Sequence, residues 1–330
     1  MRRPIILILL MGLCCPAWSH AADGVSAGLK LYHQVAGCAE NYQVEKGNSL
    51  VHLAQERGIK WTALARRNHL KPPYRMKTGM ILKIDTTHIV PDELTDGLLI
   101  NLPELDLYYF KDGTYQRRYT LAIGKPSWPT PTGNYKIIDK RRNPTWNVPE
   151  SIQEEMWDEG LEVVEKVPPG PKNPLGKFFM LTSAEGVGIH ATNRPWSVGH
   201  YASHGCIRML PDEIEKLFPE VHVGTPVKII YQPVKMALTA QGRIFLEAHP
   251  DIYQKKLDYM AMVKDLAQKN QLEDRIDWDR VPKILKAKEG IAQDITKDLP
   301  PDKPTTTTAP LPRPQENTLF PLQGKEAKLK

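Results

Sequence analysis

The sequence predicts a mostly β domain with an internal insertion, preceded by a small α+β module and followed by helices. Short strand-like runs separated by Pro- and Gly-containing turns recur between residues 97 and 232. Residues 40–86 show instead two short helical repeats between two strand-like runs. The 330 residues are 41% hydrophobic and 25% charged, which is the composition of a globular chain with enough apolar residues for a sizeable core.

Composition excludes several classes of protein. It rules out a collagen-like chain, a wholly disordered chain and a multi-span membrane protein. Lys and Arg number 44 and Asp and Glu 38, which gives a net charge of +6. This excess is too small to argue for nucleic-acid binding, so we expect no nucleic-acid partner.

The N-terminus has the pattern of a secretory signal peptide over residues 1–21. Arg2 and Arg3 precede an apolar run at 5–13, and small residues flank His20 at the expected cleavage position. The apolar run is short for a membrane span, although an uncleaved anchor is the alternative. We therefore expect an exported protein.

The module at residues 40–86 begins and ends with strand-like runs, at 42–44 and 80–84. Between them, apolar residues recur at helical spacing from Leu50, with Asn48 or Ser49 as the N-cap, and again from Trp61. The module contains the motifs Tyr-Gln-Val-Glu-Lys-Gly-Asn-Ser-Leu at 42–50, Arg-Asn at 67–68 and Lys-Thr-Gly-Met-Ile-Leu-Lys-Ile at 77–84. In these motifs it resembles a LysM domain. That resemblance implies binding to N-acetylglucosamine-containing glycan strands; a fold kept only as a spacer is the alternative.

The region from 97 to 232 carries the β-rich pattern. Strand-like runs occupy 98–102, 105–110 and 115–123, and Lys-Asp-Gly at 111–113 indicates a hairpin turn. Residues 144–176 interrupt the pattern with one helix-like stretch at 152–159 and a Pro-rich stretch at 168–171. Because a long insertion in a compact domain is often functional, we interpret this segment as a lid.

The densest motif follows the insertion, in residues 188–193 and 203–209. His190 and Cys206 suit a base and a nucleophile, because a thiol reacts well only after it loses its proton. Gly205 permits a tight turn that aims backbone N–H groups at an oxyanion. Arg208 suits a substrate carboxylate. Together these residues indicate acyl transfer on an acidic peptide.

Three alternatives compete for Cys206. Zinc binding by His200, His204 and Cys206 has an uncommon spacing and needs a fourth ligand. A disulfide with Cys38 is the second alternative, since cleavage of residues 1–21 would remove the other two cysteines. A buried, inert thiol is the third.

Residues 97–232 resemble an L,D-transpeptidase catalytic domain of the YkuD type, a β-sandwich with a capping insertion. The matching motifs are Thr-Pro-Thr-Gly at 130–133, Asn-Pro-Leu-Gly at 173–176, Ile-His-Ala-Thr-Asn at 189–193 and Ser-His-Gly-Cys-Ile-Arg-Met at 203–209. The resemblance implies that Cys206 is the nucleophile and His190 the base, with the carbonyl of Ala191 as its partner. It places His204 and Gly205 in the catalytic loop and implies no metal or cofactor. The implied substrate-binding residues are Arg208, Ser203, Thr192, Asn193, Trp196 and Tyr201.

The resemblance also implies a reaction and a location. An exported Gram-negative enzyme of this kind is periplasmic and acts on peptidoglycan stem tetrapeptides through a Cys206 thioester. The acceptor is a second stem, giving a 3-3 cross-link, or an outer-membrane protein, a D-amino acid or water. An L,D-carboxypeptidase and a non-catalytic glycan-binding protein are the alternatives. We expect a monomer.

The C-terminal part divides in two. Residues 233–298 predict a strand at 242–249 and helices at 252–268 and 284–291. Residues 299–330 are rich in Pro and Thr and predict disorder.

Overall fold

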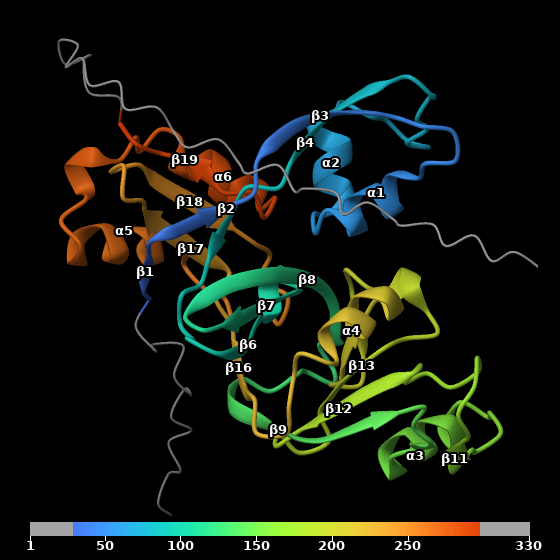
Figure 1. Ribbon diagram of the computed structural model, residues 1–330. Coiled ribbons are helices and arrows are strands. Elements are labelled where there is room, and N and C mark those ends of the chain that lie inside the picture. The colour runs from blue at the N-terminus through green and yellow to red at the C-terminus, as the bar shows by residue number, and fades with distance from the viewer. Residues whose placement is uncertain (1–28, 298–330) are drawn as a thin grey trace, which may run out of the picture. The chain divides into compact units, whose positions relative to one another are not determined.

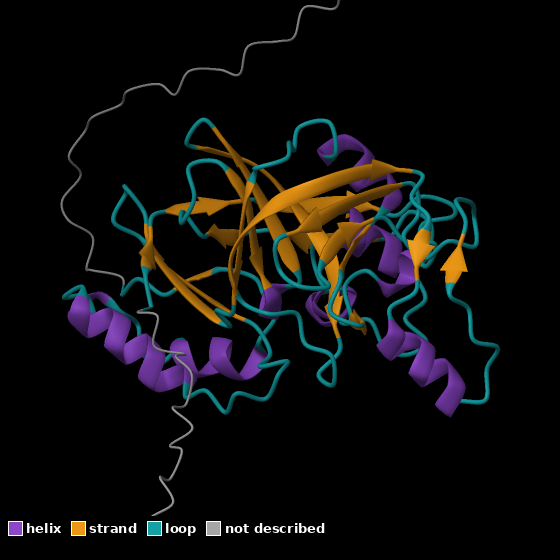
Figure 2. Cartoon of the chain, turned by 90° about the horizontal axis from the view of Figure 1, so that it is seen from below, coloured by secondary structure: helices purple, strands orange, loops and turns teal. Residues whose placement is uncertain are grey.

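The structure is a computed structural model that describes residues 29–297 (Figure 1). The predicted signal peptide at 1–21 and the Pro/Thr-rich tail at 299–330 lie outside the described residues. Strands make up most of the regular structure of the described part (Figure 2), which confirms the predicted mostly β fold class. No helix among residues 29–297 has the length and apolar character needed to cross a bilayer.

The LysM module has the predicted strand–helix–helix–strand order. Its elements are β3 (Ala39–Gln43), α1 (Leu50–Glu56), α2 (Trp61–Arg67) and β4 (Ile81–Asp85). The two strands pair antiparallel. Ser49 is the N-cap, because its side chain accepts from the His52 N–H, and Asn48 accepts from the Glu45 N–H instead. Asn68 ties α2 to β4 by donating to the Lys83 carbonyl and accepting from its N–H.

The catalytic domain is built on a nine-stranded sheet in the order β14-β8-β15-β13-β12-β9-β16-β6-β7. The strands are β6 (Gly97–Asn101), β7 (Asp106–Lys111), β8 (Thr114–Gly124), β9 (Gly133–Arg142), β12 (Phe178–Thr182), β13 (Gly188–His190), β14 (Tyr201–Ser203), β15 (Ile207–Met209) and β16 (Pro226–Ile230). An additional pairing of β7 with β8 closes the sheet on itself. The two long strands join its halves, because β8 pairs with β7 and then β15, and β9 with β16 and then β12.

Short helices and turns connect these strands. They are η1 (Leu102–Glu104), η2 (Pro195–Ser197) and α4 (Pro211–Leu217). The predicted hairpin turn joins β7 to β8, where Asp112 and Gly113 both have positive φ, as such a turn requires. The apolar face of the closed sheet forms one core, which includes Leu98, Leu121 and Ile189.

The insertion at 144–176 leaves the sheet after β9 and returns to it at β12 (Figure 1). It contains β10 (Trp146–Asn147), α3 (Glu150–Asp158) and β11 (Lys166–Val167), with β10 and β11 paired antiparallel. Asn173 is fully buried, and its side-chain amide donates to the Pro144 carbonyl at 2.8 Å. The amide thereby fastens the two ends of the insertion to each other.

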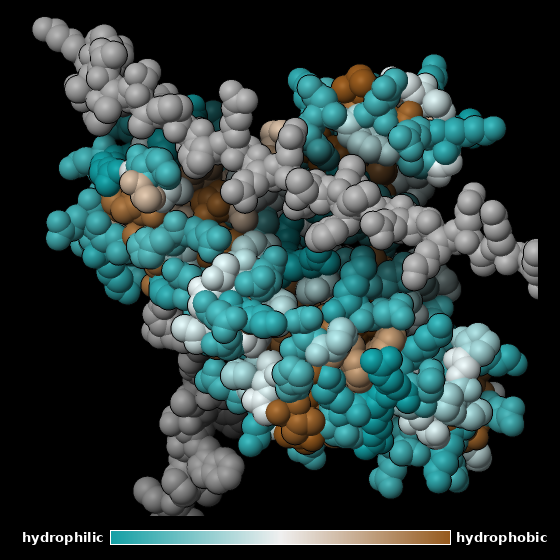
Figure 3. Space-filling model, viewed as in Figure 1, coloured by the Kyte–Doolittle hydropathy of each residue, from teal (hydrophilic) through white to brown (hydrophobic). Residues whose placement is uncertain are grey.

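The C-terminal residues form a second layer with its own core. Its elements are β17 (Val234–Leu238), β18 (Ile244–Ala248), α5 (Tyr259–Lys269), η3 (Glu273–Arg275), α6 (Val281–Ala287) and β19 (Gln293–Asp294). The N-terminal strand β1 (Leu31–Tyr32) joins this sheet, parallel to β17. A separate pair, β2 (Gln34–Ala36) with β5 (His88–Val90), follows it. The face drawn in Figure 3 is mainly hydrophilic, with its apolar residues in small separate groups.

Two C-terminal helices differ from their predicted bounds. The helix expected from 252 begins only at Tyr259, because Gln254 and Lys256 have left-handed backbone and Asp258 is the N-cap. The helix expected at 284–291 begins earlier, at Val281, and ends at Ala287 where Lys288 turns left-handed. The strand β17 has no counterpart in the sequence prediction.

Candidate active site

Two parallel strands bring His190 and Cys206 to the same place. Ile189 of β13 pairs with Ile207 of β15, and His190 with Arg208. Both isoleucines are fully buried in the core. Because side chains alternate along a strand, His190, Arg208 and Cys206 lie on the opposite face, with Cys206 directly before β15.

The His190 imidazole is buried and oriented by the backbone. Its Nδ1 lies 2.5 Å from the Ala191 carbonyl oxygen, so the ring donates from Nδ1 and leaves Nε2 as an acceptor. Burial lowers the pKa of His190 to about 4, although the Ala191 carbonyl opposes that shift. The ring is therefore neutral at pH 7 and can accept a proton at Nε2.

The Cys206 thiol also favours its neutral form. Burial raises the pKa of Cys206 above its ordinary value, while a hydrogen bond from the Gly188 backbone and the charge of Arg208 oppose the rise. Its Sγ lies 3.4 Å from the Gly186 carbonyl oxygen. A Cβ at Gly188 would come within 2.4 Å of the Phe179 ring, so a larger residue there would require that ring to move.

The loop that carries the thiol is held by hydrogen bonds from the side chains of Thr130 and Ser203. Gly205 has φ of 101°, a backbone conformation that favours glycine. Its carbonyl accepts from the Thr130 hydroxyl at 2.9 Å. The oxygen of that hydroxyl, Thr130 Oγ1, in turn accepts from the Gly124 N–H at 3.0 Å. The Ser203 hydroxyl donates to the Cys206 carbonyl.

This loop leaves two backbone donors unused. The N–H groups of Gly205 and Cys206 make no hydrogen bond among the described residues. Because a trans peptide points its C=O and N–H in opposite directions, the bond from Thr130 to the Gly205 carbonyl aims the Cys206 N–H away from Thr130. Such free, fixed donors can stabilise an oxyanion.

Arg208 is a cation without a carboxylate partner in residues 29–297. Its Nη1 lies 3.4 Å from Ser197 Oγ, and its buried Nε has no hydrogen-bond partner. Burial lowers its pKa, and the nearby guanidinium of Arg194 lowers it further. The Arg208 guanidinium beside the thiol, with Arg194 near it, can bind a carboxylate. Sequence reasoning missed Arg194, which stands outside the dense motifs.

The remaining predicted site residues differ in placement. Thr192 is buried, and its Oγ1 accepts from the Arg194 N–H. Asn193 donates to the Lys172 carbonyl of the insertion, and its Oδ1 is buried without a partner. Trp196 is exposed. Tyr201 is also exposed, and it lines the cavity between the LysM helices and the catalytic domain that is described below.

His204 contacts Glu155 and does not join His200 and Cys206 in a zinc site. Its Nε2 lies 2.5 Å from Glu155 Oε2 on α3, and its ring meets the Trp128 ring edge-on with centroids 5.3 Å apart. Glu155 also accepts from Lys125 Nζ at 2.9 Å. Sequence reasoning missed Glu155, Lys125 and Trp128, which carry no motif. Cys38 and Cys206 are both free thiols, so the disulfide alternative is not formed.

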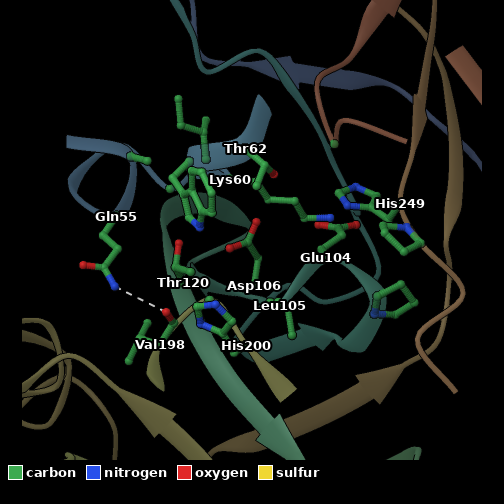
Figure 4. A pocket seen from close by; sticks show the side chains of 18 of the residues that line it. Gln55, Lys60, Thr62, Glu104, Leu105, Asp106, Thr120, Val198, His200 and His249 are labelled. Atoms are coloured by element: carbon green, nitrogen blue, oxygen red, sulfur yellow. Dashed lines mark hydrogen bonds between the residues drawn. The ribbon is translucent and has the colours of Figure 1, made fainter. Parts of the chain in front are cut away.

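A cavity of about 360 Å³ lies between the LysM helices and the catalytic domain (Figure 4). Gln55 and Lys60 face Asp106 and His200 across it, and Gln55 donates to the Val198 carbonyl. Burial raises the pKa of Asp106 to about 7 and lowers that of Lys60. The cavity therefore holds charged side chains from both modules.

One group of metal-ligand side chains comes together among residues 29–297. It comprises Glu104, Glu247 and His249, all buried. The Lys235 ammonium lies 2.7 Å from Glu104 and 3.1 Å from Glu247, so a protein cation already balances these carboxylates. His200, His204 and Cys206 do not form such a group within the same range.

Comparison with known proteins bears directly on this site. The sequence profile of the YkuD L,D-transpeptidase catalytic domain matches residues 95–229, and that of the LysM domain matches residues 42–85. The chain is 34% identical over 214 residues to the probable L,D-transpeptidase YcfS of Escherichia coli. The aligned region covers 63% of this chain and 67% of that protein.

Two further relatives carry similar names. The probable L,D-transpeptidase ErfK/SrfK of Salmonella typhimurium is 28% identical over 232 residues, 68% of this chain and 75% of that protein. Its namesake from Escherichia coli is 32% identical over 185 residues, 56% of this chain and 59% of that protein. Their shared name fits a domain that presents a thiol, an imidazole and free backbone donors together. The chain belongs to the L,D-transpeptidase family and is an enzyme of that class.

Proposed function

We propose that the protein cleaves the terminal D-alanine from peptidoglycan stem tetrapeptides through a Cys206 thioester and transfers the acyl group to an amine. The observation that carries the proposal is the placement of Cys206 and His190 on one face of two paired strands, beside Arg208. The Ala191 carbonyl lies at Nδ1 of His190, which leaves Nε2 as the proton acceptor, and two backbone N–H groups are available to receive an oxyanion.

The first half-reaction forms the thioester. His190 Nε2 takes the thiol proton while Sγ of Cys206 attacks the carbonyl carbon that precedes D-alanine. The carbonyl oxygen becomes an oxyanion facing the N–H groups of Gly205 and Cys206. The C–N bond then breaks, and the His190 proton passes to the departing D-alanine amine.

The second half-reaction reverses these roles. An acceptor amine attacks the thioester carbon and loses a proton to His190, and the sulfur leaves and regains that proton. Arg208, which has no carboxylate partner among the described residues, is suited to hold a carboxylate of the donor stem. The acceptor is a second stem in a 3-3 cross-link, or the amine of an outer-membrane protein.

The setting of this reaction is part of the proposal. The signal peptide pattern at 1–21 supports export to the periplasm, where a monomer would meet the wall. The LysM module supports binding to the glycan strands that carry the stems.

Product analysis tests this function. The chain from residue 22 onward is incubated with purified disaccharide-tetrapeptide, beside its Cys206→Ala variant, and the products are identified by mass spectrometry. We expect loss of D-alanine followed by dimers from wild type only. Tripeptide without dimers would indicate an L,D-carboxypeptidase or a missing acceptor, and an unchanged substrate would contradict peptidoglycan acyl transfer and favour a glycan-binding protein.

A further inference from the structure

We propose that Glu155 is a positioning residue that latches the capping helix α3 onto the nucleophile loop and thereby directs the Cys206 thioester to an amine acceptor instead of water. This inference rests on the proposed function. It concerns a carboxylate outside every motif of the sequence, in the insertion at 144–176.

The base of the insertion is firmly held. The Asn173 amide bonds the carbonyls of Pro144, Val167 and Pro168, and its Oδ1 accepts from the Leu175 N–H. Strands β10 and β11 pair between these ends. These bonds close the stem of the cap on itself, and Asn193 ties the stem to the rest of the domain by donating to the Lys172 carbonyl.

The helix at the tip of the insertion is held differently. No residue of α3 is fully buried, and Trp157 on it is 76% exposed; Ile152 and Met156 are only half-buried, so apolar packing holds the helix weakly. Among the described residues, the side-chain hydrogen bonds and ion pairs that join α3 to residues outside the insertion are all made by Glu155. One carboxylate thus makes the side-chain polar contacts that join the helix to the rest of the domain.

Glu155 connects the helix to two elements of the site. Its Oε1 accepts from Lys125 Nζ at 2.9 Å, directly after β8, and its Oε2 accepts from His204 Nε2 at 2.5 Å. Lys125 and His204 are themselves joined through the backbone, because the Lys125 N–H donates to the Ser203 carbonyl at 2.9 Å. The hydrogen bond from Lys125 holds the pKa of Glu155 below its usual range, so the latch is ionised at pH 7.

The latch is suited to open and close. The side chains of Lys125, Glu155 and His204 are 32%, 31% and 26% exposed. Partly exposed ion pairs are weak because water screens them. A helix held mainly by such pairs can release for substrate entry and return, which is how many lids work.

The closed position bears on the fate of the thioester. His204 is two residues before Cys206, so Glu155 holds the helix against the loop that carries the sulfur. Attack by an amine forms an amide and returns the thiol; attack by water forms a carboxylic acid and returns the same thiol. Because closure excludes water, opening favours the acid.

Paired variants of α3 test the latch. Glu155→Gln removes the charge at constant shape, and Glu154→Gln makes the same change at the exposed neighbouring position as a control. Lys125→Met breaks the second arm, and Lys125→Arg preserves its charge. Each full-length mature protein receives disaccharide-tetrapeptide with a D-amino acid as a second acceptor. The readouts are thioester occupancy on the intact protein and the ratio of tripeptide to amide products.

We expect Glu155→Gln to form the thioester normally and to raise the ratio of tripeptide to amide products about threefold or more, the scale set by a partly exposed ion pair. Lys125→Met should raise the ratio in the same direction and add little to Glu155→Gln in the double variant. Glu154→Gln and Lys125→Arg should match wild type.

Two results would overturn the inference in different ways. If wild type forms the thioester and Glu155→Gln divides it between water and amine as wild type does, the latch is wrong while the proposed function stands. If wild type forms no thioester, the proposed function fails and the latch with it.

Discussion

At the scale of single residues, the proposed catalytic pair of Cys206 and His190 is neutral before substrate arrives. Burial raises the pKa of the Cys206 thiol and lowers that of the His190 imidazole to about 4. Both shifts disfavour a thiolate–imidazolium ion pair, since each charged form loses water on burial. For the proposed mechanism, this predicts that proton transfer accompanies attack on the substrate carbonyl.

The pH dependence of thiol alkylation tests this protonation state. Cys38 is exposed and would also react, so it is first replaced in a Cys38→Ser background. Because the thiol pKa is raised, we expect the rate of Cys206 alkylation by iodoacetamide to keep rising with pH above 8. A plateau between about pH 5 and 8 would reveal a preformed thiolate and contradict the assignment.

At the scale of elements, the turn between β8 and β9 sets the geometry of the nucleophile loop. Thr130 is buried and joins the Gly124 N–H to the Gly205 carbonyl through one hydroxyl. The Tyr253 hydroxyl accepts from the Thr130 N–H and donates to the Gly124 carbonyl, so the C-terminal part supports this turn. The Thr-Pro-Thr-Gly motif thus acts through its first residue.

Thr130→Val keeps the shape of the side chain and removes this clamp. Leaving the two buried backbone groups without partners should lower the free energy of unfolding by about 1–3 kcal/mol. The rate of Cys206 acylation should fall about tenfold or more, because the Cys206 N–H loses its fixed direction. Urea unfolding and stopped-flow acylation measure the two effects, with exposed Thr132→Val as control. Destabilisation with an unchanged acylation rate would show that the clamp is purely structural.

The sequence identified the elements whose side chains follow their usual environments. The LysM helices have the periodicity of half-buried structure, and the strands β7 and β13 are short apolar runs that are buried on both faces. Strand β17 was missed because Lys235, a residue type that usually indicates exposure, is fully buried there. The Glu155–His204 contact was missed because it joins residues 49 positions apart, and nothing in an acidic helix marks one carboxylate.

At the scale of the whole described molecule, a buried charge cluster joins the C-terminal sheet to the catalytic domain. Lys235 on β17 contacts Glu104 of η1 and Glu247 of β18, and all three side chains are fully buried. Its Nζ also donates to the Ile89 carbonyl of β5, at 2.5 Å. The C-terminal residues are consequently tied to the catalytic domain through polar contacts that require a specific arrangement.

Lys235→Met should leave two buried carboxylates without their cation. We expect the free energy of unfolding to fall by about 3–5 kcal/mol, the usual cost of breaking a buried pair from one side. Lys264→Met, at an exposed position of α5, should stay within about 0.5 kcal/mol of wild type. Urea denaturation measures both, and a loss under about 1 kcal/mol for Lys235→Met would contradict the account of this cluster.

The measurement that tests the central claim most directly is the intact mass of the enzyme during turnover. The Cys38→Ser protein and the Cys38→Ser/Cys206→Ser double variant are each mixed with disaccharide-tetrapeptide, quenched in acid and weighed by mass spectrometry. The account predicts that the first protein gains the mass of the substrate minus D-alanine, and that the double variant gains nothing. An equal gain on both proteins, or amide products formed with no adduct on Cys206 at any quench time, would contradict a Cys206 thioester.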